Sequence, residues 1–301
     1  MDAFSDIKPV PPDVILSWPK PNYTDPDRRG PALLIVNCFL LPLAMVVVGM
    51  RLYTRLIIVH SAGLDDVFIL TPFLIAAVGL TIAVCLAASQ YGWDLHIWDV
   101  PEADIIPGRI VTWVAQLIFV AATNFTKLSI LLFYTRLSTV GIRTPFDYAV
   151  WGTIVFVILY IISFSISVIT ACKRCTNSQA FVYAAAGFSI FEDFIIMMLP
   201  VWELKDLNLN LRKKIALIFL FALRSFACIT SMIRLKYIIA YGTSVDVTYR
   251  NVDIVLWSVL EDYVAIICAG LMCFRPLVIR FLPSMLPTTS LSESKNPGSQ
   301  A

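Results

Sequence analysis

Charge is scarce in this sequence. Only 15% of its 301 residues are Asp, Glu, Lys or Arg, and the formal net charge is +2. Proteins that bind the phosphate backbone of DNA or RNA usually carry a strongly basic surface, so nothing in the composition indicates a nucleic-acid partner. Apolar residues make up 58% of the chain, and the mean hydropathy is +0.79. Both values exceed those of a soluble domain and indicate a membrane protein.

Side chains that hold metals and cofactors are also few. The two histidines, His60 and His96, fall in different predicted loops, and His96 is expected at the surface, whereas a structural zinc site needs four ligands in one place. No glycine-rich phosphate loop, nucleophile elbow or metalloprotease helix occurs. We therefore expect no metal and no cofactor. The last apolar stretch contains no lysine, so the chain cannot form a retinal Schiff base there, because that linkage needs a lysine amine.

Long apolar stretches dominate what is present. A hydrocarbon core of about 30 Å needs about 20 helical residues, and only helices or closed barrels satisfy their backbone hydrogen bonds in lipid. The predicted fold is all-α, a seven-transmembrane-helix bundle with helices at 32–50, 67–88, 110–135, 148–171, 180–202, 215–239 and 253–278. Residues 1–31 form a polar, proline-rich N-terminal tail, residues 32–283 the membrane domain, and residues 284–301 a disordered C-terminal tail.

The predicted orientation depends on two details, because lysines and arginines divide almost evenly between the two sides of the bundle. Asn22 begins a glycosylation sequon in the N-terminal tail, and the cluster Arg212-Lys213-Lys214 favours the cytosol. Both place the N-terminus outside and the C-terminus in the cytosol. Cys172 and Cys175 then lie in an oxidising loop, where a local disulfide can form. The predicted location is a membrane, either the endoplasmic reticulum or the plasma membrane.

Five ionisable residues lie deep inside the predicted helices. Such a side chain near the bilayer centre costs about 3 kcal/mol or more and persists beside partners or water. At about 1.5 Å per residue, a slab less than about 10 Å thick contains all five: Glu192, Asp193, Arg224, Glu261 and Asp262. Consecutive residues of a helix point about 100° apart, so one acid of each pair can face a cavity while the other meets a neighbouring helix.

These residues have two interpretations. In the first, Arg224 pairs with Glu192 or Asp193, and the ion pair locks the bundle. In the second, Glu192, Asp193, Arg224 and Glu261 form a polar, ligand-binding pocket. If the protein is an enzyme, the same residues together with Asp262 are its catalytic groups. One protonated carboxyl would donate a proton to a lipophilic substrate and a second carboxylate would accept one, which suits cyclisation or isomerisation of a polyene or epoxide.

Other charged residues have structural explanations. Asp65 and Asp66 begin the second predicted helix, where carboxylates cap free N–H groups and complement the helix dipole. Arg51 and Arg55, at the end of the first helix, are expected to contact lipid headgroups or to pair with these acids. Lys127 is expected to extend its amine toward the cytosolic face of the membrane.

Several helix-end and loop motifs resemble one fungal family. They occur in order over about residues 32–283: Arg51-Leu52-Tyr53-Thr54-Arg55 with Gly63-Leu64-Asp65-Asp66, Tyr91-Gly92-Trp93-Asp94-Leu95-His96-Ile97-Trp98, Thr126-Lys127-Leu128-Ser129-Ile130-Leu131-Leu132-Phe133-Tyr134-Thr135-Arg136, Asp193 with Leu199-Pro200, Ile233-Arg234-Leu235, and Trp257 with Glu261. On these residues the chain resembles the fungal rhodopsin-domain integral membrane proteins, a family with satratoxin-cluster and pathogenicity-related receptor-like members. The sequence departs from the family pattern by adding charge, at Asp94, Glu192, Arg224 and Asp262.

The resemblance implies a fungal seven-helix protein with its N-terminus outside, of a kind often encoded within secondary-metabolite gene clusters. The expected function is that of an integral membrane receptor-like or accessory protein in such a pathway. A membrane-embedded cyclase or isomerase that uses the buried acids is the alternative, and a small-molecule transporter is a third. The expected partners are the lipid bilayer and a lipophilic small molecule.

Overall fold

The computed structural model describes residues 18–22, 25–58, 60, 63–137, 145–171, 178–204, 211–244 and 246–271. All regular structure in these residues is helical, which confirms the predicted all-α class. The α-helices are α2 (Ala32–Tyr53), α3 (Leu64–Leu74), α4 (Thr81–Gln90), α5 (Glu102–Leu137), α6 (Pro145–Ala171), α7 (Ser178–Leu204), α8 (Leu211–Thr243) and α9 (Val247–Leu271). Three short elements accompany them: the π-helices η1 (Thr54–Ile58) and η2 (Ile75–Leu80) and the 3-10 helix η3 (Ile97–Asp99).

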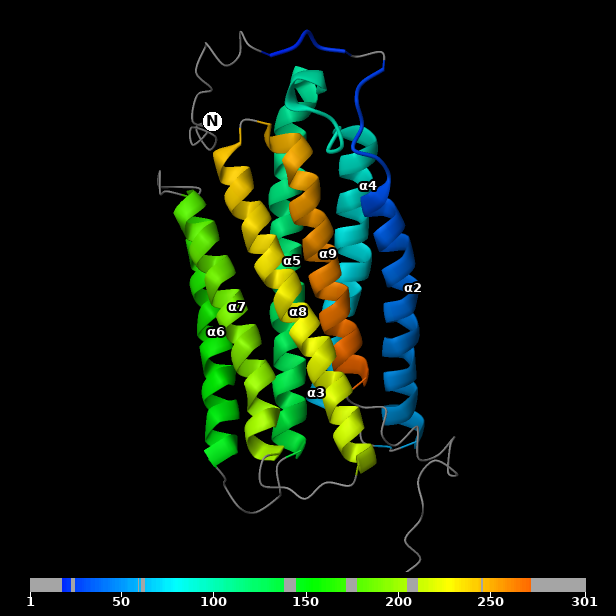
Figure 1. The fold of residues 1–301 in the computed structure, drawn as a ribbon, viewed down its shortest axis with the longest axis vertical. Coiled ribbons are helices and arrows are strands. Elements are labelled where there is room, and N and C mark those ends of the chain that lie inside the picture. Colours follow the sequence, from blue (N-terminus) through cyan, green and yellow to red (C-terminus); the bar gives the residue numbers. More distant parts are fainter. Residues whose placement is uncertain are drawn as a thin grey trace, which may run out of the picture.

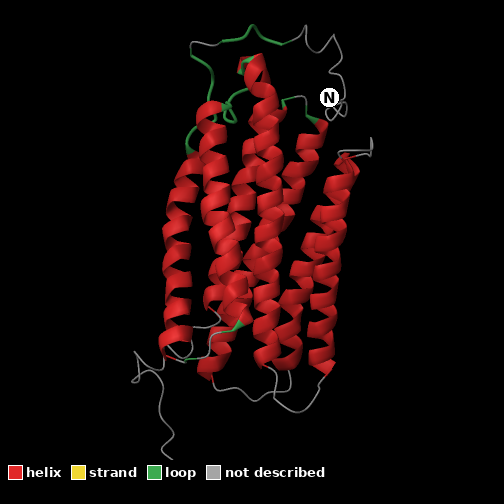
Figure 2. Cartoon of the chain, turned by 180° about the vertical axis from the view of Figure 1, so that it is seen from behind, coloured by secondary structure: helices red, strands yellow, loops and turns green. Residues whose placement is uncertain are grey.

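The helices stand side by side along one axis, with the connecting segments at the two ends (Figures 1 and 2). Within the described ranges, five are long and apolar enough to cross a membrane: Ala32–Ile58, Glu102–Thr135, Pro145–Ser167, Ala180–Val201 and Thr248–Leu271. Large apolar side chains point outward from them, among them Phe39, Trp151 and Leu159. A bundle that exposes such residues fits a lipid environment, so the chain is a multi-pass membrane protein. The predicted helices at 67–88 and 215–239 also form, as α3–η2–α4 and α8, but are not among these five.

The helix predicted at 67–88 is not a regular α-helix. Pro72 lies within α3, where its ring removes an N–H donor and clashes with the carbonyl of the preceding turn. The π-helix η2 follows directly, and a π-turn accommodates such an interruption. The elements α3, η2 and α4 therefore continue one another over residues 64–90.

Two helices begin six or more residues earlier than the apolar pattern predicts. α5 starts at Glu102 rather than at residue 110, and α9 starts at Val247 rather than at residue 253. Glu102 and Asp104 lie in the first turn of α5, where carboxylates complement the positive end of the helix dipole. Hydropathy alone misses such polar first turns, because they extend a helix beyond its apolar part.

α5 and α9 are central in the bundle. α5 packs against α3, α4, α6, α7 and α9, whereas α9 packs against α2, α3, α5 and α8. Figure 1 shows α6 and α7 at one edge of the bundle and α2 and α4 at the other. α2 and α9 approach closely at Gly270, where an added Cβ would collide with Cγ1 of Val47. This arrangement places the middle parts of α5, α7, α8 and α9 around one interior region.

A buried ion pair fastens α2 to α3 and α9. Arg51 is 0% exposed; its Nε donates to Oδ1 of Asp66 at 3.3 Å and its Nη1 to the carbonyl oxygen of Ala269 at 2.6 Å. Oδ2 of Asp66 also accepts from the backbone N–H of Gly63 at 3.2 Å, so this carboxylate caps α3. Nε of Arg55 lies 3.9 Å from Oδ1 of Asp66. The predicted pairing of these arginines with the start of the second helix is confirmed for Asp66.

His96 is only partly exposed, with 22% of its side chain accessible, because it packs against aromatic and acidic neighbours. Its ring stacks between Trp98 and Tyr249, with centroid distances of 4.6 Å and 4.1 Å. Its Nδ1 lies 2.5 Å from Oδ2 of Asp246. The loop position alone does not reveal these contacts, because two of the partners come from the α8–α9 region, about 150 residues away in sequence.

Asn22 is exposed, its backbone N–H donates to Oδ1 of Asp99 at 2.9 Å, and its Nδ2 donates to the carbonyl oxygen of Asp25 at 2.6 Å. Its glycosylation stays a prediction. The predicted disulfide between Cys172 and Cys175 and the tail at 284–301 lie outside the described residues, as does most of the tail at 1–31.

Candidate functional site

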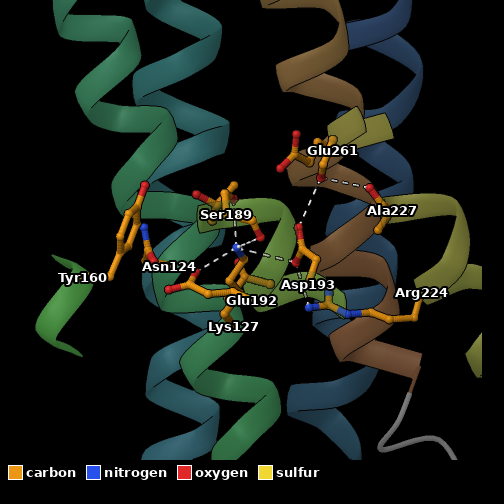
Figure 3. Close-up of polar contacts among 12 residues, drawn as sticks. Asn124, Lys127, Tyr160, Ser189, Glu192, Asp193, Arg224, Ala227 and Glu261 are labelled. Carbon is orange, nitrogen blue, oxygen red and sulfur yellow. Dashed lines mark hydrogen bonds and ion pairs between the residues drawn. The ribbon is translucent and has the colours of Figure 1, made fainter. Parts of the chain in front are cut away.

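Seven charged side chains meet in the interior of the bundle, each at most 4% exposed. They come from α5, α7, α8 and α9 and will be called the buried cluster: Lys127, Glu192, Asp193, Arg224, Arg234, Glu261 and Asp262. Figure 3 shows the contacts around Lys127, Asp193 and Arg224. The cluster contains all five residues that the sequence places at this depth and adds two cations that the sequence assigns elsewhere.

Lys127 lies at the centre of the contacts rather than extending to the cytosolic face. Its Nζ donates to the carbonyl oxygen and Oγ of Ser189 at 3.0 Å and 2.9 Å and to Oε2 of Glu192 at 3.0 Å. Oδ1 of Asp193 lies 3.6 Å away. The prediction for Lys127 was wrong because an ammonium group has three donors, and α7 supplies acceptors for them inside the bundle.

The two consecutive acids of α7 face different helices. Glu192 binds Lys127 on α5, whereas Asp193 accepts from Nη2 of Arg224 at 3.2 Å and from Oγ of Ser231 at 3.1 Å, both on α8. This division follows from the rotation of about 100° between neighbouring helical residues. The ion pair predicted between Arg224 and an acid of α7 is present, and Asp193 is the partner.

Arg234 forms the third ion pair. Its Nε donates to Oε2 of Glu261 on α9 at 2.8 Å, and its guanidinium carbon lies 4.6 Å from the ring centroid of Phe119. In the sequence, Arg234 belongs only to a helix-end motif. Its spacing contained a usable signal: Arg224, Ser231 and Arg234 are separated by seven and three residues, and such intervals place side chains on one face of a helix.

Asp262 differs from the other acids of the cluster. It is 0% exposed, and neither of its carboxyl oxygens has a hydrogen-bond partner in the described part of the chain. Oε1 of Glu192 and Oε1 of Glu261 are also without partners there, but the second oxygen of each binds a cation. Asp262 is therefore the acid of the cluster that gains least from its surroundings.

Asp262→Leu is expected to raise the free energy of unfolding by about 1–3 kcal/mol, because it removes a buried polar group without stranding a partner. The thermal midpoint of detergent-purified protein, followed by fluorescence-detected size exclusion after heating, measures the change. Glu192→Leu is the matched control and is expected to lower the midpoint, since it strands Lys127. Equal losses for both variants would show that Asp262 has a stabilising partner and would contradict the prediction.

A cavity of about 260 Å³ lies between α5, α6, α7 and α8. Five of its sixteen lining residues are aromatic, and Ser189 and Arg234 connect it to the contacts of the buried cluster. None of Glu192, Asp193, Glu261 and Asp262 is among the described residues that line it. Tyr160 and Asn124, which also line it, lie on the Ser189 side of the cluster in Figure 3. In the described ranges, no group of three or more His, Cys, Asp and Glu side chains is placed to hold a metal ion.

The cavity and the acids are thus arranged differently from what the pocket interpretation predicts. The acids mainly bind cations within the helix bundle, while the polar groups that line the cavity include a guanidinium, two amides and hydroxyls. Proton transfer needs the acid within hydrogen-bond reach of the substrate atom. The arrangement can bind a small molecule beside the cluster, and Glu192, Asp193, Arg224, Glu261 and Asp262 keep their proposed ligand-binding or catalytic roles only as predictions.

Comparison with known proteins gives relatives of low identity. Receptor GIN3 of Arthrobotrys oligospora is 23% identical over 87% of this chain and 66% of its own length. Fugralins biosynthesis cluster protein 2 of Gibberella zeae is 24% identical over 56% of this chain and 46% of its own length. The polyenoic acids biosynthesis gene cluster protein Ba17b of Metarhizium anisopliae is 22% identical over 84% of this chain and 75% of its own length.

The chain therefore spans between about half and three quarters of the length of these relatives. No solved structure matches it. The fungal rhodopsin domain matches residues 50–280, which is most of the chain and includes every member of the buried cluster. The chain belongs to the fungal rhodopsin domain family.

Proposed function

We propose that the chain is a seven-span receptor-like or accessory membrane protein of a fungal secondary-metabolite pathway. α2 with η1, the continuous α3–η2–α4, and the helices α5 to α9 provide the seven crossings. The N-terminus lies outside and the C-terminus in the cytosol. The exposed sequon residue Asn22 and the basic cluster at 212–214 support this orientation.

One observation carries the receptor-like role: the cavity beside the cluster is lined by Arg234 and Ser189 and not by the four acids. Three of those acids bind cations instead, at 2.8–3.2 Å. Binding energy that acts equally on a bound molecule and on its transition state gives affinity without catalysis. The site thus favours recognition of a lipophilic molecule over acid–base chemistry on it.

The relatives support the same setting. One is named a receptor, and others are named for biosynthetic gene clusters. The cyclase or isomerase alternative depends on Asp262, the acid of the cluster without a hydrogen-bond partner in the described ranges. Asp262 does not line the cavity, so a substrate there would not meet it without a rearrangement of α9.

The proposal predicts a pathway-wide effect of deleting the gene. In a deletion strain, products and intermediates of the affected pathway are expected to fall or rise together, along with transcripts of its genes, and wild-type complementation restores both. Metabolite profiling and RNA sequencing of the same cultures measure this. Accumulation of one intermediate with unchanged transcripts would contradict the proposal and indicate a missing enzymatic step.

A further inference from the structure

We infer that the cavity between α5, α6, α7 and α8 binds a small, neutral, aromatic or conjugated molecule whose carbonyl-type oxygen accepts hydrogen bonds from Arg234. The inference rests on the proposed function and names the class of ligand for it. Four observations lead to it: the free donors of Arg234, the internal bonding of three other polar groups in the wall, the balance of charge, and the aromatic lining.

Arg234 has more donors than its protein partners use. A guanidinium carries five N–H donors, and Glu261 accepts one of them, from Nε. The terminal nitrogens make no hydrogen bond within the described ranges, and the residue lines the cavity. Neither terminal nitrogen is among the buried polar atoms without a partner in the described residues, which fits donors that open into the cavity. A charged donor gains from a hydrogen bond there, so an acceptor on a molecule in the cavity is favoured.

Three other polar groups of the wall are hydrogen-bonded within the protein. The hydroxyl of Thr123 donates to the carbonyl oxygen of Phe119 at 3.0 Å, and that of Tyr160 to the carbonyl oxygen of Ala185 at 3.2 Å. Oγ of Ser189 accepts from Lys127 at 2.9 Å. Oδ1 of Asn124 has no hydrogen-bond partner in the described residues but is itself fully buried, and the amide of Gln116 can either donate or accept. Arg234 is therefore the wall group that favours an acceptor specifically.

The balance of charge favours a neutral acceptor over a carboxylate. The buried cluster contains three cations and four acids, and Glu261 already compensates Arg234 at 2.8 Å. An anionic ligand would enter a site that has no positive charge left over, and it would lie near Glu261. Burying a charge without a counter-charge is far more costly than burying a carbonyl group that receives a hydrogen bond.

The residues that line the cavity indicate the shape and size of the ligand's hydrophobic part and the side from which it enters. Trp113, Phe119, Phe164 and Phe181 contribute aromatic faces, which favour flat or conjugated molecules. About 260 Å³ is at the small end of ligand sites, so a molecule of about two fused rings is a suitable size. Trp113 both lines the cavity and is 48% exposed, so the cavity reaches the surface of the bundle, where a lipophilic molecule would enter from the bilayer.

Three naphthalenes that differ only in the substituent at position 2 test the inference. The full chain in lipid nanodiscs is equilibrated with 2-acetylnaphthalene, 2-isopropylnaphthalene or 2-naphthoate, and bound probe is measured by equilibrium dialysis against empty nanodiscs. One hydrogen bond from a charged donor corresponds to an affinity difference of about tenfold or more. The ketone is therefore expected to bind at least about tenfold more tightly than the hydrocarbon, and more tightly than the carboxylate.

Two double variants locate the preference. Arg234→Met/Glu261→Gln removes the donor together with the charge that it balances, and the ketone is then expected to bind no better than the hydrocarbon. Arg224→Met/Asp193→Asn removes a similar buried pair whose members do not line the cavity, and it is expected to keep the ketone preference. A preference that survives the first variant would overturn the assignment to Arg234.

The remaining outcomes are also decisive. Binding of 2-naphthoate more tightly than the ketone would overturn the neutral class, and no binding of any probe above empty nanodiscs would overturn the site. These results come from purified protein and do not depend on the pathway. A pathway-wide change in the deletion strain without ketone binding would leave the proposed function and remove the ligand class. Ketone binding together with one accumulating intermediate would keep the ligand class and contradict the proposed function.

Discussion

Lys127→Met is expected to lower the free energy of unfolding by about 3–5 kcal/mol, the usual cost of removing one partner from a buried ion pair. Lys127 is the only described partner of the Glu192 carboxylate, and it also holds Ser189. Without it, Glu192 would be left with no hydrogen bond in the interior. The thermal midpoint of the purified protein and its yield of monodisperse material measure the loss.

The double variant Lys127→Met/Glu192→Gln is the control for charge. It removes both members of the pair, and Asp193 keeps its contacts with Arg224 and Ser231. Most of the lost stability is expected to return, because a buried pair replaced by neutral groups costs much less than a stranded charge. An unchanged midpoint for Lys127→Met alone would show that its amine lies at the membrane surface, as the sequence alone had predicted.

Arg51→Met is expected to have a similar effect, about 3–5 kcal/mol, because it strands Asp66 at the start of α3. It also removes the hydrogen bond to the carbonyl oxygen of Ala269 in α9. Arg55 stays within 3.9 Å of Asp66 and is expected to offset part of the loss. The midpoint and the fraction of protein that remains folded in detergent are the readouts.

Arg28→Met provides the comparison for Arg51. Arg28 pairs with Asp94 at 3.5 Å, but its side chain is 62% exposed, and exposed ion pairs contribute little. Its midpoint is expected to match that of the wild type. Equal midpoints for the Arg28 and Arg51 variants would contradict a stabilising role for the buried pair.

The fold was predictable from the sequence because the bilayer imposes a length on apolar helices. The apolar pattern predicted the long helices of the described ranges, but it missed the 3-10 helix η3, the polar first turns of α5 and α9, and the π-turn after Pro72. Those features depend on helix dipoles and on local backbone interruptions rather than on hydropathy.

The candidate site was predictable only in part. Depth along each helix brought Glu192, Asp193 and Arg224 to one level, and Arg224 pairs with Asp193 there. Depth does not give the direction of a side chain, so the inward position of Lys127 and the pairing of Arg234 with Glu261 were missed.

Contacts between distant segments were the least predictable. The packing of His96 against Tyr249 joins residues about 150 positions apart, and the cavity needs four helices to form its wall. A single sequence gives helix lengths and helix faces, but it does not specify which faces meet.

The most direct test of the central claim is the metabolite profile of a deletion strain complemented with Asp262→Asn or with Lys127→Met/Glu192→Gln, at protein levels matched to the wild type. These variants remove the acid without a hydrogen-bond partner in the described ranges and the acid that Lys127 binds. If the buried acids serve structure and the cavity serves recognition, both variants restore the wild-type profile. Accumulation of one pathway intermediate with either variant would contradict the account and place carboxyl chemistry in the bundle.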